Sequence, residues 1–116
     1  MRMRQPFLKV LILAILISEG ELHGYLLHKR ILHHTCMRWK PSIGTIYRVL
    51  NEMVEEGLVL RRDEGRRHSY VVTRKGIEYF IRNSEAPLTR MAGVMATLLN
   101  AYLKVRGVGR WCYLGT

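Results

Sequence analysis

Two short groups of polar and basic residues between Pro41 and Val72 are the part of this sequence best suited to chemistry. The first group is Ser42, Gly44, Thr45, Tyr47 and Arg48, and the second is Arg66, Arg67 and His68. An arginine guanidinium can bind a phosphate, or O6 and N7 of guanine, through two parallel hydrogen bonds. Hydroxyl side chains bind phosphate oxygens. We therefore predict that both groups contact double-stranded DNA.

The first group lies at the start of a predicted helix over residues 43–56, with Ser42 as its N-cap and Gly57 as its stop. The apolar side chains of one face, spaced three and four apart, should pack inward: Ile43, Ile46, Leu50, Met53 and Val54. The second half carries the carboxylates of Glu52, Glu55 and Glu56, which DNA would repel. Only the first two turns are therefore expected to approach DNA. For Tyr47, packing in the core is an open alternative.

The second group lies in a predicted hairpin. Its strands are residues 58–62 and 68–72, its turn is residues 63–67, and Gly65 permits the positive φ that such turns need. A solvated turn without a partner is the alternative interpretation of these basic residues. A helix followed by a basic hairpin is typical of a winged helix, in which the helix enters the major groove beside the hairpin. The predicted fold is therefore mainly α with a small β-hairpin wing.

Four further helices should complete the chain. Residues 6–18 form a helix that is apolar nearly all round and must be covered on more than one side. The next helix, residues 23–33, should turn one apolar side inward, with Tyr25, Leu26, Ile31 and Leu32. Thr73 is expected to cap a helix over residues 74–82, which Asn83, Ser84 and Pro87 interrupt. A last helix then spans residues 84–104.

The last helix carries an apolar seam in which large side chains step by three and four residues, as at the a and d positions of a heptad. These residues are Leu88, Met91, Met95, Leu98, Tyr102 and Val105. The seam could pack on its own chain, but the excess apolar surface of the first helix favours a homodimer through both helices. The predicted organisation is a winged-helix domain (1–83), a C-terminal dimerisation helix (84–105) and a flexible tail (106–116).

Composition narrows the class of protein. The 116 residues include 19 Lys and Arg against nine Asp and Glu, and the net charge of +10 indicates a polyanionic partner, either a nucleic acid or an anionic membrane. Two cysteines form no disulfide framework, which favours the cytoplasm. The apolar run 7–17 is broken by Lys9 and is too short to span a membrane, and it lacks a signal-peptide cleavage site.

The sequence gives little support for a metal site or for catalysis. His33, His34 and Cys36 invite a metal site, but adjacent histidines on a helix point about 100° apart and no second ligand cluster follows. There is no phosphate loop and no nucleophile with a neighbouring base. We therefore expect no metal, no cofactor and no catalytic residues.

Four short motifs resemble the PadR family of transcriptional regulators over about residues 7–80. They are His23-Gly24-Tyr25, Gly44-Thr45-Ile46-Tyr47, Glu55-Glu56-Gly57-Leu58 and Thr73-Arg74-Lys75-Gly76. The resemblance implies a winged helix-turn-helix repressor that binds DNA as a homodimer through its C-terminal helix. It also implies DNA contacts from Ser42, Thr45, Tyr47, Arg48, Arg66 and Arg67. A small aromatic effector near the dimer interface is implied as well. The short C-terminal region, Pro87 and the glycine-rich end depart from the family pattern.

The sequence thus favours a sequence-specific transcriptional repressor that binds an inverted-repeat operator as a homodimer. A nonspecific architectural nucleic-acid-binding protein is the alternative, since charge alone would serve it. The two differ in the ratio of their affinities for operator and random duplex.

Overall fold

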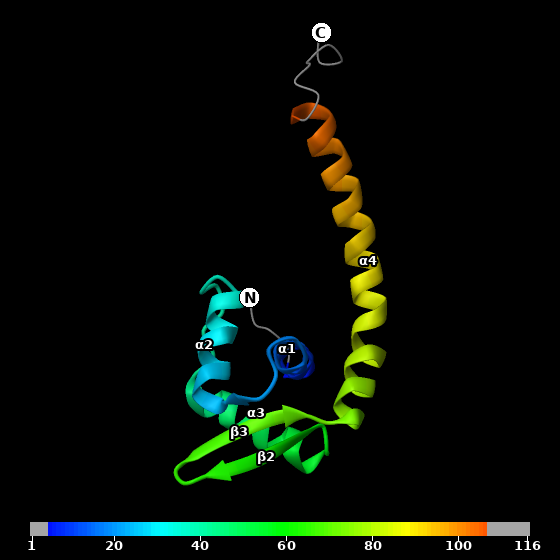
Figure 1. Ribbon diagram of the computed structural model, residues 1–116. Coiled ribbons are helices and arrows are strands. Elements are labelled where there is room, and N and C mark those ends of the chain that lie inside the picture. The colour runs from blue at the N-terminus through cyan, green and yellow to red at the C-terminus, as the bar shows by residue number, and fades with distance from the viewer. Residues whose placement is uncertain (1–4, 107–116) are drawn as a thin grey trace. The chain divides into compact units, whose positions relative to one another are not determined.

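The computed structural model describes residues 5–106 and is mainly helical with one small sheet (Figure 1). The helices are α1 (Gln5–Glu19), α2 (Gly24–His34), α3 (Ile43–Glu55) and α4 (Arg74–Arg106). The strands are β1 (Leu22–His23), β2 (Val59–Glu64) and β3 (Arg67–Val72). Both sheet pairings are antiparallel, and the strand order is β1-β3-β2. The winged-helix fold that the sequence predicts is confirmed, with α4 as a long C-terminal helix.

Helix α4 corrects the prediction of two separate helices, because it runs from Arg74 to Arg106 with Pro87 inside it. Proline removes one backbone donor, which would otherwise bond the carbonyl of Asn83, but its φ is itself helical. Asn83 is exposed, so water can reach the carbonyl that the proline leaves without a donor. The chain divides into two compact units at this point, one of residues 1–83 and one that begins at Ser84. The predicted tail lies, apart from Arg106, outside the described residues.

The core of the first unit is built around α1, which contacts α2, α3 and β3. Its fully or nearly fully buried side chains are Leu8, Ile12, Leu13, Ile15 and Leu16. The prediction that this helix must be covered on more than one side is confirmed. The apolar surface that suggested a dimer contact is therefore largely satisfied within the same chain, with Phe7 and Ile17 still exposed.

The helix faces differ in part from those predicted. In α3, Ile46, Leu50 and Met53 are buried as expected, but Val49 is buried too and Ile43 is exposed. Ile43 is the first residue of α3, so no preceding helical turn lies beside its side chain. In α2 the buried apolar side chains are Leu27 and Ile31, and the predicted inward residue Tyr25 is exposed.

The sheet has a third strand that the sequence did not suggest. In β1, Leu22 pairs with Tyr70 and His23 with Ser69, so His23 precedes α2 instead of opening it. A two-residue strand is too short to show alternation in sequence. The hairpin strands also run further than predicted, since Glu64 pairs with Arg67 and the turn shrinks to Gly65 and Arg66. Gly65 has the expected positive φ, +63°.

The four family motifs form two interlocking contacts. Gly24 of the first motif lies against Tyr47 of the second, and a Cβ at position 24 would stand 2.5 Å from Tyr47 Cε1. Gly76 of the fourth motif lies against Leu58 of the third, and a Cβ there would stand 2.2 Å from the Leu58 carbonyl oxygen. Thr73 completes the second contact. Its Oγ1 accepts from the Gly76 amide (3.0 Å) and donates to the Gly57 carbonyl (2.7 Å). Both glycines therefore permit a close approach of two elements.

Candidate nucleic-acid interface

The first turns of α3 present small polar groups on an exposed surface. Ser42 is the N-cap that the sequence predicts, since its Oγ accepts a hydrogen bond from the Thr45 amide at 3.1 Å. Ser42 Oγ also lies 3.0 Å from Thr45 Oγ1. Gly44 is exposed, and its missing side chain leaves the backbone open to a large partner. This end of α3 is therefore well ordered, and a neighbouring backbone can reach it.

Arg48 is exposed one turn further along α3. Its Nη1 lies 3.3 Å from Oε1 of Glu52, an exposed pair at i, i+4 spacing. Such a pair contributes about 0.3–0.5 kcal/mol, so it can open for a stronger anionic partner. Arg48 is thus held loosely on the face that Thr45 and Gly44 share.

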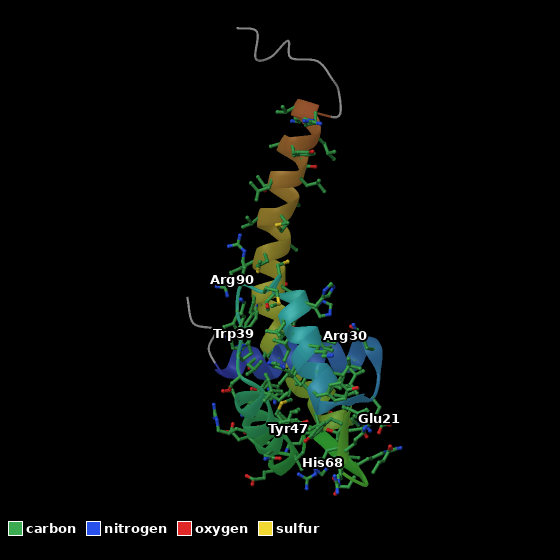
Figure 2. The ribbon with its side chains drawn as sticks, turned by 90° about the vertical axis from the view of Figure 1, so that its left-hand side faces the viewer. Glu21, Arg30, Trp39, Tyr47, His68 and Arg90 are labelled. Carbon is green, nitrogen blue, oxygen red and sulfur yellow. The ribbon has the colours of Figure 1, made fainter. Side chains whose placement is uncertain are left out.

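Tyr47 lies between the core and this face. It is half-buried, it packs against the core cluster, and its ring contacts the position of Gly24 (Figure 2). The side chain therefore supports the α2–α3 packing, as the alternative interpretation of Tyr47 requires. A contact between its hydroxyl and a phosphate stays a prediction.

The wing, which we define as β2, β3 and the turn of Gly65 and Arg66, carries the second basic group. Arg66 and Arg67 are exposed, and neither forms an ion pair with another residue in the described part of the chain. His68 differs, because its Nδ1 donates to Oδ1 of Asp63 at 2.6 Å. Asp63 and His68 are paired across the two strands, so this contact joins them. Arg66 and Arg67 are therefore the basic side chains of the wing that lack a partner of opposite charge among these residues.

Arg61 connects the wing to α3, which the sequence analysis did not foresee. Its Nη1 donates to Oδ1 of Asn51 at 3.4 Å, and its Nε lies 3.3 Å from Oδ1 of Asp63. Arg61 is also the cross-strand neighbour of Tyr70. Burial raises the pKa of the Tyr70 phenol, and the Arg61 guanidinium partly offsets that rise. Strand alternation places Arg61 and Asp63 on the face of buried Val59, which is the signal that could have found them.

Lys9 of α1 partly offsets the negative charge at the acidic end of α3. Lys9 Nζ donates to Oε1 of Glu56 at 2.9 Å and lies 3.6 Å from Oε2 of Glu52. Burial lowers the pKa of Lys9, but the hydrogen bond to Glu56 and the charges of Glu56 and Glu52 outweigh it, so the pKa lies above its ordinary value of 10.5. The repulsion between these carboxylates and a neighbouring polyanion is therefore reduced.

The predicted seam lies in the second unit. Its members from Leu88 to Tyr102 are each between 56% and 62% exposed, and Val105 is partly buried. Three more large apolar side chains of the same helix segment are exposed: Val94, Leu99 and Leu103. Residues 84–106 form this one helix, so no second element within that range covers these side chains.

Within residues 5–106, no group of three or more His, Cys, Asp or Glu side chains could hold a metal ion, and Cys36 is an exposed free thiol. In the same range, every helix is too short or too polar to cross a bilayer.

Comparison with known proteins extends the resemblance. Residues 12–82 match the model of the PadR-like family of transcriptional regulators. The transcriptional regulator YqjI of Escherichia coli (strain K12) is 35% identical over 79 residues, which are 67% of this chain and 38% of that protein. The chain thus spans less than half the length of the curated relatives that it matches.

Two solved structures are similar in fold. One is a transcriptional regulator from Clostridium thermocellum, Cth-833, with a TM-score of 0.63 and 24% identity, covering 84% of this chain and 90% of that one. The other is Bacillus subtilis PadR in complex with operator DNA, with a TM-score of 0.55 and 27% identity, covering 63% of this chain and 44% of that one. The family match, which spans more than half of the sequence, shows that this chain belongs to the PadR-like family of transcriptional regulators.

Proposed function

We propose that this chain binds an inverted-repeat operator in double-stranded DNA as a homodimer and represses transcription in the cytoplasm. The observation that carries the proposal is the pairing of an exposed, capped start of α3 with two exposed wing arginines, Arg66 and Arg67, that have no ion-pair partner among the described residues. The solved complex of B. subtilis PadR with operator DNA supports it by similarity.

The side chains of α3 and of the wing are suited to different parts of the DNA. Thr45 and Arg48 are suited to base edges or phosphates in the major groove, because α3 meets DNA through its first two turns. Arg66 and Arg67 are suited to the phosphate backbone or the minor groove beside it. His68 is already paired with Asp63, so we propose for it a supporting role in the wing.

The dimer contact is proposed for the seam of α4 alone. Each large apolar side chain that becomes buried contributes about 1.5–3 kcal/mol, and packing of an apolar face supplies most of the stability of helices in proteins. A two-fold dimer presents two recognition helices to major grooves about 34 Å apart, which requires an inverted repeat. The small aromatic effector stays a prediction.

The experiment that tests the proposal compares affinities for promoter DNA and random duplex. We expect a ratio of about 10³ or more for a specific regulator, and a log-log dependence on salt near −0.9 for each phosphate neutralised. A ratio near one with the same salt dependence would establish the alternative, a nonspecific architectural protein. A slope near zero, or tighter binding to single strands, would overturn both.

Two substitutions assign the contacts. Arg48→Ala should cost about 1–3 kcal/mol of operator binding and relax the sequence preference, if Arg48 reads a base. Arg67→Ala should weaken operator and random duplex by similar factors, because a phosphate contact carries no sequence information. Fluorescence anisotropy with both duplexes measures each effect. Unchanged operator affinity in both variants would show that the binding face lies elsewhere.

A further inference from the structure

A chain of polar contacts runs from α3 into the wing. Asn51 of α3 accepts from Arg61 of β2, the same guanidinium lies 3.3 Å from Asp63, and Asp63 accepts from His68 of β3. Figure 2 shows His68 on the wing and Tyr47 on the neighbouring α3. We call Asn51, Arg61, Asp63 and His68 the wing tether. It joins three elements through one carboxylate, since Asp63 Oδ1 is the atom that both Arg61 and His68 approach.

Asp63 is an unexpected side chain in this place. The wing belongs to a chain of net charge +10, and its proposed partner is a polyanion. A carboxylate there repels phosphate and lowers affinity through charge alone. Asp63 is more than half exposed, so packing does not explain it. What Asp63 does provide is the bridge between Arg61 and His68.

We propose that Asp63 is a positioning residue that fixes the wing against α3, so that Arg66 and Arg67 meet the backbone while α3 occupies the groove. The geometry supports this role because the tether starts on α3 and ends on β3 beside Arg67. Without the Asp63 carboxylate, the Arg61 guanidinium loses one of the two groups that orient it toward α3. The side-chain bridge from β2 to His68 is lost as well, while the backbones of β2 and β3 stay paired. The proposal rests on the proposed DNA-binding function and names residues that act through others within it.

The decisive variant is Asp63→Asn, because charge and tether predict opposite results. Removal of a carboxylate should tighten DNA binding if Asp63 acts only through its charge. The asparagine amide keeps an acceptor oxygen but loses the negative charge that strengthens both contacts. The weakened tether should instead reduce operator binding by about threefold to tenfold, the range that two exposed polar contacts cover. The matched control is Glu64→Gln, the next residue of the same wing, which forms no ion pair with another described residue. We expect Glu64→Gln to tighten binding to operator and random duplex alike.

A second measurement separates positioning from loss of wing structure. Arg67→Ala should weaken operator binding less in the Asp63→Asn background than in the unaltered chain, because an untethered wing already places Arg67 poorly. In the Glu64→Gln background the effect of Arg67→Ala should keep its full size. Arg61→Lys retains the charge but replaces the guanidinium, whose Nη1 and Nε contact Asn51 and Asp63 separately, with a single nitrogen, so it should resemble Asp63→Asn.

The outcomes are distinguishable. If Asp63→Asn tightens operator binding as Glu64→Gln does, the tether has no positioning role and the inference is overturned. The same follows if the effects of Asp63→Asn and Arg67→Ala simply add. If the unaltered chain itself prefers no operator over random duplex, the proposed function fails instead. Circular dichroism and thermal unfolding should show all variants folded, and a collapse of Asp63→Asn alone would count against a purely positional role.

Discussion

The two most apolar helical stretches of this chain are α1 and the part of α4 from Leu88 onward. They differ in how far their apolar side chains are buried. In α1, five large apolar side chains are buried and α2, α3 and β3 surround the helix. In α4, eight large apolar side chains from Leu88 to Leu103 are about half exposed or more. Apolar content therefore does not decide whether a helix is covered within its own unit.

The pattern of the apolar residues explains the difference. Helix α1 is apolar on nearly all sides, which suits a central helix that several elements contact. The apolar residues of α4 step by three and four along one seam, which suits one partner helix. We infer that the first unit completes its core alone and that the seam of the second unit needs cover from outside that unit, for which we propose a second copy of the chain.

The largest expected effect comes from breaking the proposed partner contact. Leu98→Glu places a charge in the seam and should dissociate the dimer. Operator affinity should then fall about 100-fold or more, because the second half-site no longer benefits from a linked subunit. Sedimentation and anisotropy measure the two results. Asn100→Glu, on the opposite side of the same helix, should change neither.

A monomeric unaltered protein at micromolar concentration with tight operator binding would contradict this prediction. It would also remove the argument for an inverted-repeat operator. The seam would then require some other cover.

A pair of glycine substitutions sharpens the comparison of the two units. Gly76→Ala puts a Cβ where the Leu58 carbonyl lies 2.2 Å away, so it should destabilise the first unit by about 1–3 kcal/mol. Gly93→Ala puts a Cβ where no atom lies within 4 Å, so it should stabilise α4 by up to about 1 kcal/mol. Thermal or denaturant unfolding measures both. Equal effects of the two substitutions would refute the close approach at Gly76.

The smallest expected effect concerns the ion pairs of Lys9 within the first unit. Lys9→Met should cost about 0.5–1 kcal/mol at neutral pH, since the paired carboxylates are partly exposed. Burial lowers the pKa of Lys9, but the hydrogen bond to Glu56 and the charges of Glu56, Glu52 and Tyr79 raise it above its ordinary value. A raised pKa means that this stabilisation is present below the unfolded value and is lost as the pH rises through the folded value.

The difference in unfolding free energy between Lys9→Met and the unaltered chain should therefore shrink above about pH 10.5. Chemical denaturation at neutral and alkaline pH measures it. Lys40→Met, at an exposed lysine without an ion pair in the described range, is the control and should change stability little at either pH. A difference that grows with pH would contradict the sign of the shift.

Local chemistry in the sequence determined much of this molecule. Ser42 and Thr73 predicted their helix starts, because the hydroxyl oxygen of an N-cap accepts from the backbone amide three residues further on. Gly65 predicted the hairpin turn, and the spacing of apolar residues in α3 predicted the burial of Ile46, Leu50 and Met53. The exposed positions of Arg48, Arg66 and Arg67 also follow from local pattern.

Only the tertiary structure decided the features that depend on residues far apart in the chain. Strand β1 exists because β3 offers it an edge, and Tyr47 is half-buried because Gly24 lets the two helices close around it. Arg61 reaches Asn51 only once the wing has folded against α3. Pro87 looked like a helix stop in sequence, yet α4 continues through it, since one lost hydrogen bond on an exposed helix does not outweigh the turns on either side.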